Sequence, residues 1–218
     1  MTDTYNKPKG PSESAQEKEF ELRAHIGSIW SGGRLFIGMY VFIIASLVFS
    51  YFYLRSANNG MLWRLPHQRG PLAFGWAIFL LMLTTTLLTV VGQRRLRRHA
   101  VVDFQVAAWT GVLCGVLALV LQIIQLTKMP FYPGSSGYAS CFIGYAVINL
   151  MSIFSGTFWL EATVARSHYL TKELGERHAA QGHAPATQSW RADVASMTYF
   201  WGFLSLSGAL LFAMFYLM

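Results

Sequence analysis

The sequence has 218 residues, of which 54% are hydrophobic and 12% are charged, and its formal net charge at pH 7 is +7. A soluble domain needs a charged surface around its apolar core, and this composition supplies too few charges for one. The apolar residues form long runs separated by basic segments, so the positive charge indicates membrane topology and no nucleic-acid partner is expected.

Residues 1–28 are hydrophilic and are interpreted as a cytoplasmic N-terminal tail. The first half is expected to lack regular structure, and residues 17–25 predict a short helix lying at the membrane surface. No apolar run precedes Ile29, so a cleavable signal peptide is not expected and the first span would act as the insertion signal.

The first predicted span covers residues 35–54, twenty positions without a charge. At 1.5 Å per residue this run crosses a hydrocarbon core about 30 Å thick. Arg34 and Arg55 flank the run, and aromatic side chains gather at its second end, as is typical of a membrane interface. The run has no polar face, which argues against a core helix of a soluble protein.

Four further spans are predicted at residues 71–92, 104–127, 138–160 and 194–218, so residues 29–218 form a five-helix membrane domain. Gly111 and Gly115 lie four residues apart in the third span and predict a face that another helix approaches closely. The second span carries four threonines that are expected to hydrogen-bond to their own or a neighbouring helix rather than line a polar pore. These are Thr84, Thr85, Thr86 and Thr89.

The basic residues predict the orientation of the chain. Arg94, Arg95, Arg97 and Arg98 form a cluster after the second span that is typical of a cytoplasmic loop. With the N-terminus inside, 13 Lys and Arg residues lie on the cytoplasmic side and 4 on the other. By the positive-inside rule the N-terminus is therefore predicted inside and the C-terminus outside.

The spans carry few groups capable of chemistry. All six histidines are expected in loops or tails, and no span has an acidic or basic residue at its middle. Neither a haem ligated within the spans nor a membrane proton relay is therefore expected. Cys114 and Cys141 lie in apolar runs and are interpreted as reduced thiols.

The first span and the residues after it read LFIGMYVFIIASLVFSYFYLRS. This stretch resembles the opening helix of subunit III of the haem–copper terminal oxidases, whose pattern is L-F-I-x-S-E-x-x-F-F-x-x-x-F-x-A-Y-F-Y-L-R. In GVLALVLQIIQL, Gln122 falls on the family's glutamine. The closing segment, TYFWGFLSLSGALLFAMFYLM, is similar to the family's last helix, with Trp201, Phe203, Phe212 and Tyr216 in place. The resemblance covers residues 34–218 and matches the five-helix form of the family.

The chain departs from the family at its ionisable membrane positions. The family's glutamates fall on Tyr40 and Gln125, and its membrane histidines and acid fall near or on neutral residues. These residues are Ala146, Asn149, Gly202 and Ser205. The departures argue against the proton-handling role credited to the family's subunit. Packing and lipid binding are the family roles that remain expected for this chain.

The resemblance implies a non-catalytic accessory subunit of a respiratory haem–copper oxidase, in which partner subunit I reduces oxygen. Haem and copper are expected in the partner subunits and none in this chain, which would hold phospholipid in a cleft and join subunits I and II. The expected location is the bacterial cytoplasmic membrane. The residues expected to contact lipid or a partner are Tyr40, Tyr53, Arg55, Gln122, Trp201 and Phe203.

Two alternatives remain open on the sequence. One is the related accessory subunit of a nitric oxide reductase system. The other, from a different class, is a stand-alone membrane transporter or scaffold.

Overall fold

The computed structural model describes residues 11–58, 63–66, 68–175 and 184–218, and it contains no strand within these ranges. The helices are α1 (Pro11–Ala57), α2 (Leu72–Arg97), α3 (Val101–Thr127), α4 (Gly137–Leu174) and α6 (Pro185–Phe212). A π-helical turn, η2 (Ala213–Leu217), follows α6. All five long helices have the length and composition needed to cross a membrane. The predicted all-α bundle of five spans is therefore confirmed.

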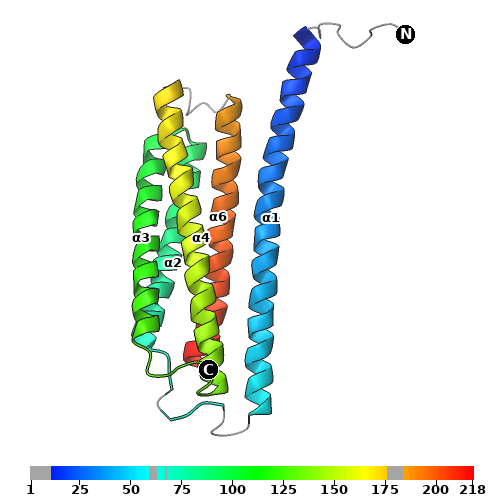
Figure 1. Cartoon of the computed structure of the whole chain (residues 1–218). Helices are drawn as coiled ribbons and strands as arrows, with labels where there is room; N and C mark the ends of the chain where they lie inside the picture. The colour runs from blue at the N-terminus through cyan, green and yellow to red at the C-terminus, as the bar shows by residue number, and fades with distance from the viewer. Residues whose placement is uncertain (1–10, 59–62, 67, 176–183) are drawn as a thin grey trace, which may run out of the picture.

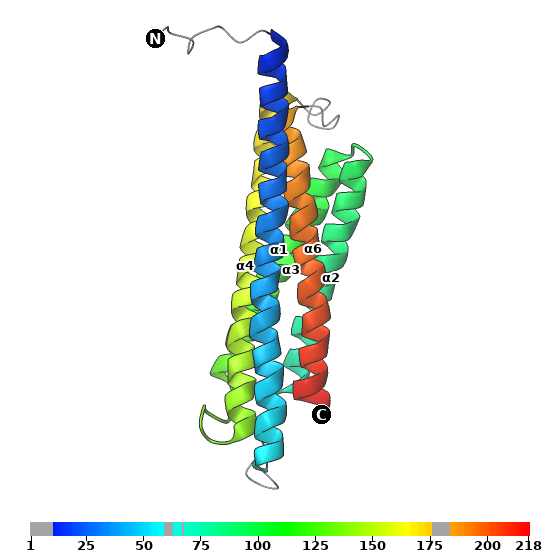
Figure 2. The same cartoon turned by 90° about the vertical axis from the view of Figure 1, so that its right-hand side faces the viewer.

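The helices run side by side as one bundle with α1 along its flank (Figure 1). Helices α2, α3 and α4 pack each against the next, as expected for short connections. Helix α1 instead packs on α6 and α4 and has at most marginal contact with α2 (Figure 2). The start of α1 and the C-terminus lie at opposite ends of the bundle, as five spans require.

Helix α1 is longer than the sequence predicts. It runs for 47 residues without a break, so residues 17–25 are helical as predicted but form part of α1 and not a separate short helix, and the tail boundary at residue 28 falls inside α1. Pro11 occupies the first turn, where a helix tolerates it. Beyond it an apolar face recurs every three or four residues through Leu22, Ile26 and Ile29, so nothing in the sequence ends the helix.

Other boundaries also differ from the predicted spans. Helix α4 continues the fourth span to Leu174, and Gly175, with a positive φ of 77°, ends it. At its start the Ser136 side chain accepts a hydrogen bond from the Ala139 backbone N–H. Helix α6 begins at Pro185, nine residues before the predicted fifth span. Between α4 and α6, residues 176–183 lie outside the described residues.

Aromatic side chains fill much of the core. Phe104 of α3 and Trp190 of α6 meet edge to face, at a centroid separation of 5.4 Å. Near the other end, the Tyr51 hydroxyl of α1 donates to the Met214 carbonyl at 3.0 Å, which ties the first helix to the last turn of the chain. Both contacts involve fully buried rings, so they fix the position of α6 within the bundle.

Three of the four predicted threonines lie in the core. The Thr85 hydroxyl donates to Leu81 O of its own helix and contacts Gly111 O of α3. Thr89 bonds back to Thr86 O. The expected bonding within and between helices is therefore confirmed for these residues, while Thr84 is exposed.

Candidate functional site

The predicted glycine pair forms a close contact between α3 and α4. A Cβ added to Gly111 would lie 3.1 Å from Leu160 Cδ2, and one added to Gly115 would lie 2.4 Å from Thr157 Oγ1. Both neighbours belong to α4. The pair therefore makes a packing face inside this chain and not a surface for a partner.

Three of the residues expected to contact lipid or a partner are buried instead. Tyr40 is 6% exposed and packs against Phe36 and Phe200, with ring centroids at 5.1 and 5.7 Å. Trp201 is fully buried, and its indole N–H donates to Gly156 O at 3.2 Å. Gln122 is 1% exposed. The prediction is wrong for these three because an apolar helix does not reveal which side faces its neighbours.

The remaining contact residues lie nearer the surface. Tyr53 is 59% exposed, and Arg55 is exposed with its guanidinium donating to the Tyr51 hydroxyl at 3.3 Å. Phe203 is half-buried beside both parts of the hydrophobic core. These three side chains remain available to lipid or to another subunit.

A buried set of neutral polar side chains joins α3, α4 and η2, and we call it the amide cluster: Gln122, Gln125, Asn149 and Tyr216. Asn149 Nδ2 donates to Gln122 Oε1 at 2.8 Å, and Gln122 Nε2 donates to Gln125 Oε1 at 3.0 Å. Gln125 Nε2 in turn donates to the Tyr216 hydroxyl. Amides neither bind nor release a proton near pH 7, so the three amides of the cluster fix the register of their helices without changing charge there.

A second polar contact joins α2 to α6. The Thr86 hydroxyl lies 2.9 Å from Trp201 O and 2.7 Å from Ser205 Oγ. The Ser205 hydroxyl also reaches Met82 O at 3.4 Å. Each hydroxyl has hydrogen-bond partners within the bundle, so this contact stabilises the packing of α2 against α6.

The histidines and cysteines do not converge in the described part of the chain. No group of three or more His, Cys, Asp or Glu side chains suited to a metal ion occurs there, and both cysteines are free thiols. The prediction that every histidine lies in a loop or tail is wrong for His25 in α1 and His168 in α4. His168 Nε2 accepts a hydrogen bond from Trp109 Nε1 at 3.0 Å. His67, His178 and His183 lie outside the described residues.

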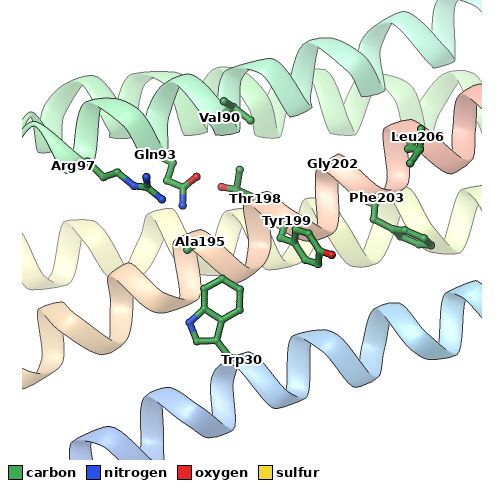
Figure 3. Close-up of a pocket in the computed structure, with 10 residues that line it drawn as sticks. All are labelled: Trp30, Val90, Gln93, Arg97, Ala195, Thr198, Tyr199, Gly202, Phe203 and Leu206. Atoms are coloured by element: carbon green, nitrogen blue, oxygen red, sulfur yellow. The ribbon is translucent and has the colours of Figure 1, made fainter.

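Between α1 and α2, along the outer side of α6, lies a cavity of about 530 Å³ that we call the α6 groove (Figure 3). Trp30 enters it from α1, and Gln93 and Arg97 enter from α2. The α6 side is formed by Ala195, Thr198, Tyr199, Gly202, Phe203 and Leu206. An adjoining cavity of about 270 Å³ shares Gln93, Arg97 and Ala195 and adds Arg191.

Sequence reasoning missed this groove. From the sequence, Arg97 and Arg191 are interpreted as topology signals. The groove exists only because α1, α2 and α6, which are distant in sequence, pack beside one another. The one local signal was that Gln93 and Arg97 lie four residues apart and so share a helix face.

Comparisons with protein-family models and with curated proteins give no match for this chain.

Proposed function

We propose that this chain is a non-catalytic membrane subunit of a respiratory haem–copper oxidase complex, in which partner subunit I reduces oxygen. The observation that supports the proposal best is the neutral, well-packed interior at the positions where the resembled family has ionisable groups. Tyr40 packs among aromatic rings, Gln125 belongs to the amide cluster, and Ser205 bonds to Thr86.

A coupled transporter or a proton relay places a titrating group at membrane depth, because an ion or proton must be held on its way across. Here each of these positions serves helix packing. A chain built in this way contributes shape and surface to an assembly and leaves the redox chemistry to its partners.

The outer surface suits such a role. Helix α3 exposes a row of large apolar side chains, and α2 exposes a second row. In a membrane these rows contact lipid or the helices of another subunit. Subunits I and II in the bacterial cytoplasmic membrane are the proposed partners, with haem and copper held by them.

The test is to purify the tagged chain from its own host membrane in a mild detergent. Co-purification of haem and copper, together with oxygen consumption, is expected in a fixed ratio to the chain. The same tag on an unrelated membrane protein of that host is the control.

Two outcomes would reject the proposal. A chain that purifies without a haem protein favours the stand-alone transporter or scaffold. A partner that contains haem but no copper and consumes nitric oxide favours the nitric oxide reductase system.

A further inference from the structure

The end of the bundle where α1 stops carries basic side chains and no acidic ones. The connection from α1 to α2 lies at this end, opposite the start of α1 (Figure 1). In the sequence, no Asp or Glu occurs at residues 22–102 or 104–160, and none follows residue 193. The basic side chains of this end are exposed or half-buried, and none of them is paired with a carboxylate among the described residues. They are Arg55, Arg64, Arg69 and Lys128.

Two of these arginines lie over aromatic rings. The Arg64 guanidinium is 5.6 Å from the centre of the buried Tyr138 ring. The Arg55 guanidinium is 5.9 Å from the centre of the buried Tyr51 ring and donates to the Tyr51 hydroxyl. The Trp63 ring contacts both tyrosines edge to face, at centroid separations of 5.1 and 6.1 Å. Each guanidinium has five N–H donors, so both arginines retain donors for a carboxylate.

Hydrogen bonds hold the loop between α1 and α2 against the start of α4. Tyr138 N donates to Trp63 O at 2.9 Å, and Gly70 N donates to the Tyr138 hydroxyl at 3.2 Å. Between these two points the Gln68 side chain is buried, and its amide donates to the Ser135 hydroxyl at 3.0 Å. The two arginines of the loop lie between these bonds, so they are held in place before a partner arrives. Side chains held in this way lose less freedom on binding.

The requirements of membrane topology do not explain these charges. With the C-terminus outside, as the charge count predicts, this end lies outside the cytoplasm, where loops are normally poor in Lys and Arg. The three arginines follow a row of three aromatic rings, so they form an extended surface and not a pocket for one small anion. Tyr53 and Tyr132 at the same end are 59% and 71% exposed. Arginine and tyrosine are the side chains enriched where proteins bind each other.

We propose that the arginine face, defined as Arg55, Arg64 and Arg69, binds an acidic surface of a partner protein in the aqueous phase. Carboxylates of the partner pair with the guanidinium groups, and charge complementarity of this kind selects the partner and speeds the encounter. A second copy of this chain does not fit, because this end has no Asp or Glu to offer. The proposal holds whether or not the chain belongs to an oxidase.

The experiment is photocrosslinking in the native membrane. Leu65, which lies in the loop beside Arg64 and is 42% exposed, is replaced by benzoylphenylalanine in the full, tagged chain produced in its own host. After irradiation the adduct is purified, and the crosslinked peptide is sequenced by mass spectrometry. We expect one main protein adduct whose crosslinked peptide contains several Asp or Glu residues. Irradiation in about 0.5 M salt should lower its yield about fivefold or more, because salt screens exposed charges.

Charge variants test the arginines themselves. Arg64→Gln with Arg69→Gln should lower the yield of this adduct about fivefold or more. Arg94→Gln with Arg98→Gln removes the same charge at the other end of α2 and should leave the yield unchanged. Benzoylphenylalanine in place of Leu87, which is exposed on α2, is the control for position and should not give this adduct.

Several results would overturn the proposal. No protein adduct, or a crosslinked peptide without acidic residues, would show that the arginine face does not bind an acidic protein. An adduct with phospholipid alone would assign the arginines to lipid headgroups, and an adduct with a second copy of the chain would indicate self-association. Equal loss in both arginine pairs would reduce the effect to overall charge. If the variant lacking Arg64 and Arg69 does not fold, a yield that salt does not lower in the chain with both arginines is sufficient to reject the proposal.

Discussion

At the scale of single residues, one of the closest contacts between two helices is that of Gly115 with α4. The 2.4 Å between a Cβ at Gly115 and Thr157 Oγ1 is shorter than any normal contact, and Thr157 is itself buried. Helices in a membrane gain little from apolarity alone, so a close approach of this kind contributes directly to their association.

Gly115→Ala should therefore lower the free energy of unfolding of the purified chain by about 1–3 kcal/mol, because the added methyl group overpacks the contact. In a Thr157→Ala background the clashing hydroxyl is gone, and Gly115→Ala should then lower the free energy of unfolding much less. A double-mutant cycle on the melting temperature measures the difference. Gly144→Ala is the control, since a Cβ there meets nothing within 4 Å. Equal costs for Gly115→Ala in both backgrounds would contradict the contact.

The amide cluster leads to a second prediction. Asn149→Leu removes the donor to Gln122 Oε1 and leaves that buried oxygen without this partner, at a cost of about 1–3 kcal/mol. Ser155 on the same helix is half-buried, and its hydroxyl bonds only to Met151 O of that helix, so Ser155→Leu should be close to neutral. Thermal unfolding in one detergent compares the two. If both variants unfold alike, the cluster does not stabilise the bundle.

Tyr40 occupies the position of a membrane glutamate in the resembled family, and its ring packs on Phe36 and Phe200. Tyr40→Phe keeps these ring contacts, so in the proposed oxidase complex the rate of oxygen consumption and its pH profile should stay nearly unchanged. Tyr40→Ala should lower the stability of the chain by about 3–5 kcal/mol through the cavity it leaves. Loss of activity in an assembled Tyr40→Phe complex would show that the phenol has a chemical role.

At the scale of elements, α1 divides into a part packed on the bundle and a first part that extends past the other helices (Figure 1). Residues 15–21 are all exposed, so deletion of residues 1–21 should leave the melting temperature of the isolated chain within about 1–2 °C of the wild type. Deletion of residues 1–33 also removes Gly33, which lies against Ser196 of α6, and should destabilise the chain. A large loss in the shorter deletion would mean that the extension supports the bundle.

The number of spans was predictable because uniformly apolar runs of this length have few other stable states. The rotation of each helix was not predictable, and this explains the errors at Tyr40, Gln122 and Trp201. Helix ends were less predictable, because α1 and α4 continue beyond their apolar runs, as far as Pro11 and the cap residue Gly175 respectively. The groove was hidden because Arg97 and Arg191 lie 94 positions apart and are brought together only by tertiary structure.

At the scale of the whole molecule, the charge distribution predicts that the end of the bundle near Arg97 and Arg191 faces the cytoplasm. A reporter fused after Met218 should then be active only in the external compartment. A reporter placed between Gly175 and Ala184 should be active in the cytoplasm. The reverse pattern would invert the orientation, and activity of both reporters on one side would contradict the number of spans.

The hydrogen bond from Tyr51 to Met214 joins residues 163 positions apart. During synthesis at about 5–20 residues per second, the first helix therefore waits roughly 8–33 s for this partner to be made. Until α4 and α6 are made, its bundle-facing aromatic side, including Phe36, Tyr40 and Tyr51, contacts lipid, the insertion machinery or another chain. Helix α1 therefore completes its packing only when α6, the last helix, has been made. A ribosome that stalls before residue 185 leaves α1 without the helix on which it mainly packs.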